Sequence, residues 1–157
     1  MTSGSHADNP MGFTAQAMLC DSAAAVEGKL YIQGGGWNAI AAATMPLTAP
    51  RIGLALLLEV PYGDTERRHQ LSLGLVDEDG SVMPLGPMVD GQRTTHLQIG
   101  FEVGRPAELP PGDTQLLPFA LNIDGYAFTR PGGYLFVLAV DGQELIRLRF
   151  RVHLRPS

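Results

Sequence analysis

The sequence has little cysteine and little charge. Cys20 is the one cysteine in 157 residues, so no disulfide can form within the chain, and we expect a reducing, cytoplasmic location. Charged residues make up 17% of the chain, below the roughly 25% typical of soluble domains. The 11 basic and 16 acidic residues give a net charge of -5, whereas proteins that bind nucleic acid usually carry a basic surface. We therefore expect no nucleic-acid partner.

Long apolar runs are also missing. The longest strongly apolar run covers residues 52–58, whereas a membrane-spanning helix needs about 20 apolar residues. Residues 1–10 contain no lysine, no arginine and no apolar stretch, so they do not resemble a signal peptide. We expect residues 1–11 to be a flexible tail, residues 12–157 to be a single domain, and no membrane to be a partner.

Helical periodicity is the third absence. The 19 glycines and 12 prolines interrupt any long helix, and we expect at most one helical turn, at residues 37–44. Apolar and polar side chains instead alternate with a period of two, which is typical of a β-strand with one buried face. In residues 144–155, one face carries Leu148, Phe150, Val152 and Leu154, and the other carries Arg147, Arg149, Arg151, His153 and Arg155.

Other alternating or continuously apolar segments predict further strands. They cover residues 13–20, 29–34, 52–60, 70–76, 97–103, 116–123 and 134–140. We expect residues 21–28 to be a connection, and residues 84–95 and 105–114 to be long loops. Tyr126 and Phe128 are expected in a loop that follows Asp124-Gly125.

These segments predict an all-β fold, an antiparallel immunoglobulin-like (Greek-key) sandwich of seven to nine strands. Asp141-Gly142 predicts a tight hairpin between the last two strands, because glycine tolerates the positive φ of a type I′ turn. Tyr134 follows a Pro-Gly-Gly turn and enters an apolar strand. This pattern resembles the tyrosine corner of such sandwiches, in which the hydroxyl bonds to upstream backbone.

The basic row at residues 147–153 is the main candidate site. Neighbouring side chains on one face of a strand lie about 6.6–6.8 Å apart, so their like charges repel unless another group neutralises them. One interpretation is an anionic partner, such as an acidic protein surface, held by Arg147, Arg149, Arg151 and His153. The other is cross-strand ion pairing, with Glu59, Glu102, Asp124 or Glu144.

Other residue patterns predict no catalytic, cofactor or metal site. Residues 34–36 are all glycine but lack the lysine and the helix of a phosphate-binding loop. Asp77 and Asp79 lack the later ligands of a calcium loop, so a hydrogen-bonded turn is expected there. The histidines have no partners at metal-ligand spacing, and Cys20 is expected to be a buried apolar side chain.

Three aromatic residues are candidate interface anchors: Trp37, Tyr62 and Tyr126. If the protein instead binds a small ligand or carbohydrate, these side chains should stack around one concavity.

Several short motifs resemble an uncharacterised family of small bacterial proteins, a domain of unknown function. They are AMLCD at residues 17–21, GKLYI at 28–32, LVDEDG at 75–80, GYLF at 133–136 and VDG at 140–142. The resemblance extends over residues 13–154. It implies a β-sandwich of unassigned function and carries over no catalytic residue.

The expected function is a non-enzymatic binding or structural module that acts through a sheet face or edge. Its partner would be another protein or a second copy of the chain, because strands apolar on both faces in a chain of few charges favour association. Two alternatives stay open. One is a sandwich that binds a small ligand or carbohydrate. The other is an enzyme whose site is not visible as a motif, in which Cys20 with a histidine, or carboxylates with His69 or His96, would share a cleft.

Overall fold

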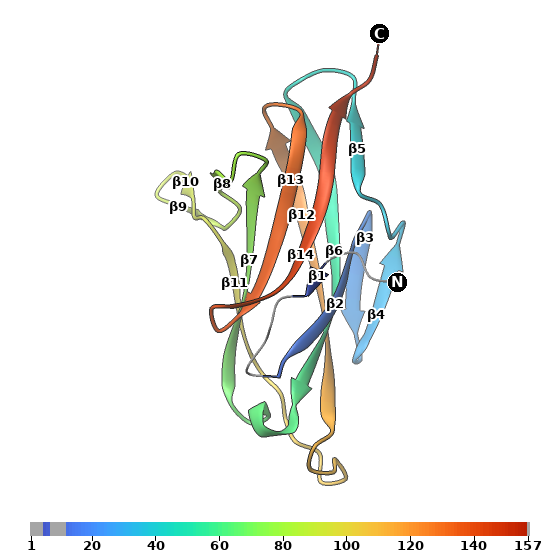
Figure 1. The fold of residues 1–157 in the computed structure, drawn as a ribbon, viewed down its shortest axis with the longest axis vertical. Helices are drawn as coiled ribbons and strands as arrows, with labels where there is room; N and C mark the ends of the chain where they lie inside the picture. Colours follow the sequence, from blue (N-terminus) through green and yellow to red (C-terminus); the bar gives the residue numbers. More distant parts are fainter. Residues whose placement is uncertain (1–4, 7–11, 157) are drawn as a thin grey trace.

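The computed structural model describes residues 5–6 and 12–156, which form antiparallel β-sheets (Figure 1). Among these residues the one helical element is η1 (Tyr62–Asp64), a single 3-10 turn, and no helix could cross a membrane. The predicted all-β class is therefore confirmed. Most of the predicted tail, residues 1–11, lies outside the described residues, but β1 (Ser5–His6) pairs with β14 (Gln143–Leu154).

Four long strands form the larger sheet. Their order is β14, β13 (Gly132–Val140), β7 (Arg68–Asp77) and β11 (Leu97–Glu102), and each is antiparallel to its neighbour. Besides β1, two short strands extend this sheet. β5 (Ala39–Ala42) pairs parallel with the end of β14, and β8 (Val82–Met83) pairs antiparallel with β7.

The smaller sheet consists of β12 (Thr114–Phe128), β6 (Leu47–Pro61) and β2 (Thr14–Cys20), again antiparallel. A hairpin of β3 (Ser22–Val26) and β4 (Lys29–Gln33) packs on it through Ala23 and Leu30. A second hairpin, β9 (Met88–Val89) and β10 (Gln92–Arg93), projects beyond β7 and β11 (Figure 1).

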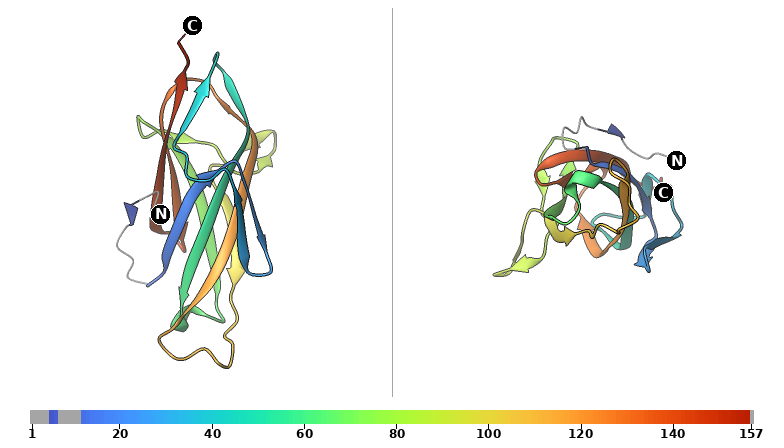
Figure 2. Two further views of the ribbon diagram at one scale, coloured as in Figure 1. Left: turned by 90° about the vertical axis from the view of Figure 1, so that its right-hand side faces the viewer. Right: turned by 90° about the horizontal axis from the view of Figure 1, so that it is seen from below.

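The hydrophobic core lies between the two sheets, which curl around it when the molecule is seen end on (Figure 2). Alternate side chains of each long strand point inward, as the period-two pattern predicts. Leu54, Leu56 and Leu58 of β6 are fully buried, as are Phe136 and Leu138 of β13. The sheets therefore form one continuous core.

Two segments differ from the prediction because alanine has a weak preference for strands. Residues 22–26, predicted as a connection, form β3, which turns into β4 through Glu27 and Gly28 with φ of 51° and 74°. Residues 39–42, predicted as part of a helical turn, form β5 against β14. With the two-residue strands β1, β8, β9 and β10, these segments bring the described strands to fourteen rather than seven to nine.

Strand β12 is also longer than predicted. Tyr126 and Phe128, expected in a loop, lie within β12 opposite Ala49 and Leu47 of β6. Both aromatic side chains are buried, so core packing outweighs the turn preference of the preceding Asp-Gly pair.

The two turns that frame β13 agree with their sequence signals. Asp141 and Gly142 have φ of 51° and 81°, as the predicted two-residue hairpin requires. At the other end of the strand, the Tyr134 hydroxyl donates to the Arg130 carbonyl at 2.6 Å. Strand β13 is thus fixed at both ends, which sets the register of β14 beside it.

Candidate functional site

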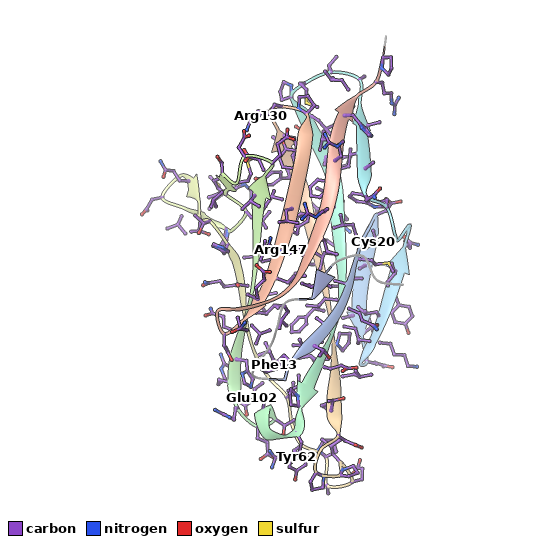
Figure 3. All side chains as sticks on the ribbon, viewed as in Figure 1. Phe13, Cys20, Tyr62, Glu102, Arg130 and Arg147 are labelled. Carbon is purple, nitrogen blue, oxygen red and sulfur yellow. The ribbon has the colours of Figure 1, made fainter. Side chains whose placement is uncertain are left out.

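The basic row lies on the exposed face of β14, with its apolar neighbours in the core. Leu148, Phe150 and Val152 are buried, so the arginines between them must point to solvent. Arg147 lies near the middle of the strand in Figure 3. The prediction fails only at Leu154, which is 47% exposed because the strand continues past the core.

Ion pairing neutralises only one arginine of this row. Arg147 makes two contacts with Glu144, at 2.7 and 3.0 Å. Within the part of the chain that the structure describes, the guanidinium groups of Arg149 and Arg151 have no ion pair and no hydrogen bond. Two positive charges therefore lie next to each other on a solvated face.

The topology explains why most of the predicted ion pairs are absent. Across β13, Arg147, Arg149 and Arg151 face Val137, Leu135 and Gly133 respectively, none of which carries charge. Glu59 and Asp124 lie on the smaller sheet, where Thr14 donates to Glu59 and Arg51 pairs with Asp124 at 2.6 Å. Glu102 lies on β11, two strands beyond β13. Of the four predicted partners, only Glu144 reaches the row.

A depression of about 490 Å³ lies beside the row. One wall is formed by Arg147, Arg149 and Arg151, and its floor includes Gly133 and Leu135 of β13 and Val76 of β7. A Cβ at Gly133 would lie 3.7 Å from the Arg151 Nη2 and 3.7 Å from the Glu78 Cβ. The missing side chain of Gly133 thus keeps the depression open between a basic wall and Glu78.

Asp77, which also lines the depression, is already neutralised. Its Oδ1 accepts from the backbone N–H groups of Asp79 and Ser81 at 3.0 and 2.9 Å, and its Oδ2 accepts from Arg130 at 2.7 Å. The Ser81 N–H and the Arg130 guanidinium outweigh burial and hold the pKa of Asp77 below its usual value. The hydrogen-bonded turn predicted at residues 77–80 is confirmed. Among the described residues no group of three or more metal-ligating side chains is found.

The remaining predicted site residues are dispersed. His153 is exposed near the end of β14, beyond the lining of the depression. Trp37 packs edge-on against Phe150. Tyr126 is buried and donates to the Pro84 carbonyl at 2.8 Å.

Tyr62 follows the end of β6, at the lower end of the molecule in Figure 3, whereas Tyr126 pairs near the start of β6. These two aromatic side chains therefore lie at opposite ends of the 15-residue strand. The concavity expected of Trp37, Tyr62 and Tyr126 together does not form, so the small-ligand interpretation gains no support here.

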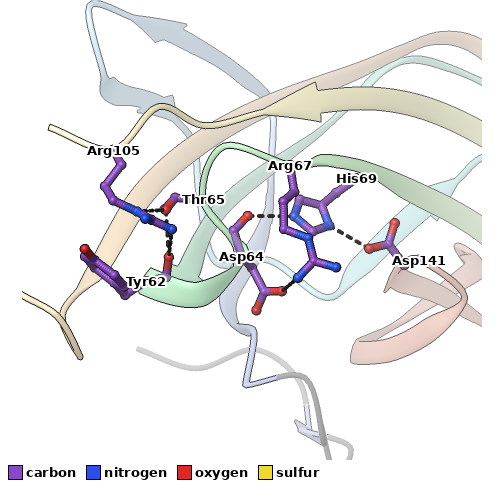
Figure 4. A network of polar contacts seen from close by, with 7 residues as sticks. All are labelled: Tyr62, Asp64, Thr65, Arg67, His69, Arg105 and Asp141. Atoms are coloured by element: carbon purple, nitrogen blue, oxygen red, sulfur yellow. Dashed lines mark hydrogen bonds and ion pairs between the residues drawn. The ribbon is translucent and has the colours of Figure 1, made fainter.

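A polar network surrounds His69 (Figure 4), which the enzyme alternative groups with carboxylates, although the sequence does not identify its partners. His69 is 6% exposed, its Nδ1 lies 2.7 Å from the Asp141 Oδ2, and its Nε2 lies 2.8 Å from the Asp64 carbonyl. The signal was its parity with Leu71, Leu73 and Leu75, which places His69 on the inward face of β7. A buried imidazole needs hydrogen-bond partners. Asp64 in the η1 turn and Asp141 in the β13–β14 turn supply them.

Both partners of His69 are hydrogen-bond acceptors, so the protonated imidazolium, which has two N–H donors, satisfies both contacts. Burial lowers the pKa of His69. The contacts with Asp141 and Asp64 together raise this pKa by more than burial lowers it, so it lies above its usual value. Burial raises the pKa of Asp141, but hydrogen bonds from His69 and the Gln70 N–H bring it below its usual value. The pair links β7 to the β13–β14 turn.

Arg105 extends the network on the far side of η1. It stacks over the Tyr62 ring at 4.1 Å, and it donates to the Thr65 hydroxyl at 2.7 Å and to the Tyr62 carbonyl at 2.9 Å. One face of the Tyr62 ring is thus covered by the guanidinium group of Arg105. Cys20 lies elsewhere, fully buried as predicted, and burial raises the pKa of its thiol.

Comparison with solved structures gives only distant similarity. A β-glucosidase from Erythrobacter marinus aligns over 90% of this chain and 15% of its own, with 16% identity and a TM-score of 0.40. A β-glucosidase from Listeria innocua, in complex with glucose, aligns over 90% of this chain and 16% of its own, with 8% identity and a TM-score of 0.41. At these scores neither enzyme carries an argument about this chain, which spans about a sixth of their length. No curated protein matches the sequence.

A family model, described as a family of unknown function (DUF6941), matches residues 15–153. This segment is nearly the one over which the sequence motifs resemble a domain of unknown function, and it includes both sheets and the basic row. The resemblance is confirmed: the chain belongs to the DUF6941 family.

Proposed function

We propose that this protein is a non-enzymatic binding module that holds an acidic protein partner on its arginine face. The arginine face comprises Arg147, Arg149 and Arg151 of β14 with the depression beside them. One observation carries the proposal: Arg149 and Arg151 are adjacent, exposed and without a counter-ion among the described residues.

Charge density supports an anionic partner. Adjacent arginines on one strand face repel at about 6.6–6.8 Å, and carboxylates of a partner would relieve this repulsion through charge-assisted hydrogen bonds. The guanidinium fork also suits bidentate contact with carboxylates. The exposed arginine face could thus bind acidic groups with no rearrangement of the strands.

The architecture that presents this face is proposed to be an immunoglobulin-like Greek-key sandwich. The order β2-β6-β12 opposite β14-β13-β7-β11 supports it, because these folds pack two antiparallel sheets with such crossing connections. The hydrogen bond from Tyr134 to the Arg130 carbonyl supports it further, as the expected tyrosine corner. We also expect a cytoplasmic, bacterial protein.

Self-association is the alternative way to occupy a surface of this chain. The β9 strand and its surroundings expose Val82, Met88 and Val89, each more than half exposed, and exposed apolar groups often mark interfaces. Sedimentation at micromolar concentration tests it: a species of twice 16.8 kDa supports a homodimer, and a clean monomer removes it.

Binding of fluorescent poly-L-glutamate tests the proposed function. The variant R147Q/R149Q/R151Q removes the row, and R51Q/R67Q/R68Q removes the same charge from other exposed positions. Wild type and the second variant should bind in low salt and lose affinity as salt screens the charges, whereas the first variant should not bind. Equal binding by both variants would overturn the proposal.

A further inference from the structure

The spacing of the arginine face defines the partner more narrowly, and this inference rests on the proposed function. We infer that the partner presents an extended segment with carboxylate side chains at alternate positions, laid along β14. Three features carry the inference: the repeat of the arginines, the shape of the depression and the position of Glu78.

The arginines repeat at the spacing of an extended chain. Arg147, Arg149 and Arg151 occupy every second residue of one strand, so neighbours lie about 6.6–6.8 Å apart. Side chains i, i+2 and i+4 of an extended partner have the same repeat. In a helix, carboxylates at i, i+4 and i+8 rise about 6 Å per step and rotate by about 40°, so the third turns away from the row.

The depression offers room for the backbone of such a segment. Its floor of Gly133, Leu135 and Val76 is apolar or small, and its volume of about 490 Å³ lies in the range of roughly 300–1,000 Å³ common for binding sites. Gly133 is essential to this shape, because any side chain there would enter the space between Arg151 and Glu78.

The opposite wall sets the pattern of charges. Glu78 is exposed, and its carboxylate lies over Gly132, across Gly133 from Arg151. Side chains of an extended segment alternate in direction, so those facing β14 can be acidic while the intervening ones face Glu78. A run of consecutive acidic residues would direct one carboxylate toward Glu78, where like charges repel. The face thus favours alternating over contiguous acidic residues.

Two synthetic peptides of equal composition test this preference. One has the sequence Thr-Glu-Thr-Glu-Thr-Glu-Thr and the other Thr-Thr-Glu-Glu-Glu-Thr-Thr, both blocked at their ends, and inorganic tripolyphosphate is the third probe. Since exposed ion pairs contribute up to about 1 kcal/mol each, we expect the alternating peptide to bind about fivefold tighter or more in low salt. The variant R149Q/R151Q should abolish the difference, and E78Q should reduce it by tightening the contiguous peptide.

The outcomes separate this inference from the proposed function. Equal affinity for both peptides, lost in R147Q/R149Q/R151Q, would overturn the alternating register and leave an acidic partner in place. Binding of tripolyphosphate without either peptide would overturn the inference in favour of a phosphate ligand. Peptide binding that ignores the arginine changes, or no binding of any probe, would overturn both.

Discussion

Asp141 holds the imidazole of His69 at 2.7 Å, between the Asp64 carbonyl and the hairpin that joins β13 to β14. Phe13 packs edge-on against the imidazole, with 5.1 Å between the ring centroids, and the centroid of the Phe101 ring lies 5.4 Å from that of the imidazole. The Asp141 Oδ1 also accepts from the Gln70 N–H at 2.8 Å. The turn that begins the arginine strand is therefore tied to β7 by a pair of which His69 is buried and Asp141 is partly exposed.

The stability of the protein should depend on pH through this pair. The pKa of His69 is raised, so its contribution is complete below about pH 6.5, the ordinary histidine pKa, and is lost as the pH rises through the higher value of the folded state. The pKa of Asp141 is lowered, so its contribution is lost on acidification below about pH 4. Urea unfolding from pH 5 to pH 9 should show the free energy of unfolding falling toward alkaline pH.

The variant D141N provides the control, because other groups titrate in the same range. It should lower the free energy of unfolding by about 1–3 kcal/mol near pH 6, the usual effect of leaving a buried polar group poorly paired. Its alkaline decline should be smaller than that of the wild type. An identical pH profile in D141N would mean that His69 does not carry the dependence.

The hydroxyl of Tyr134 should stabilise the start of β13. Y134F removes its hydrogen bond to the Arg130 carbonyl while keeping the ring stacked on Phe150, whose centroid lies 5.6 Å away. We expect a loss of about 0.5–1.5 kcal/mol in urea unfolding, the net value of one hydrogen bond. A variant as stable as the wild type would show that the bond has no net effect.

The arginines proposed to bind the partner should contribute little to folding. Arg149 and Arg151 are exposed and have no ion pair among the described residues, so R149Q and R151Q should change the free energy of unfolding by no more than about 0.5 kcal/mol. Removal of either charge also relieves repulsion within the row. A clear destabilisation by either change would indicate that the guanidinium groups serve the fold rather than a partner.

Gly133 should control access to the depression. Its φ is outside the left-handed region, and a Cβ there would meet other atoms only at 3.7 Å or more, so an alanine should fit the strand. G133A should therefore keep the free energy of unfolding within about 1 kcal/mol and yet weaken poly-L-glutamate binding. Unchanged affinity in G133A would exclude the depression from the binding site.

The sequence predicts the parts of this molecule that depend on local pattern. The arginine strand, the Asp141-Gly142 hairpin and the bond of Tyr134 all follow from alternation or turn chemistry over a few residues. Strands β3 and β5 do not, because their alanines gain strand structure only from pairing with β4 and β14. Tyr126 likewise belongs to β12 because its ring is buried in the core.

The candidate site shows the same division. Alternation alone places Arg147, Arg149 and Arg151 on one exposed face, but which carboxylates they meet depends on strand order. Glu59 and Asp124 were reasonable partners from the sequence, yet the topology puts them on the other sheet. The partnership of His69 with Asp141, 72 residues apart, also required the structure.

A nuclear magnetic resonance titration with the alternating peptide tests the central claim most directly. If the arginine face binds acidic partners, backbone amide signals should shift along β14 from Arg147 to Arg151, at Gly133 and Leu135 of β13, and at Glu78. They should stay in place in R147Q/R149Q/R151Q. Shifts confined to the smaller sheet or to the β9–β10 hairpin would contradict the assignment of this face.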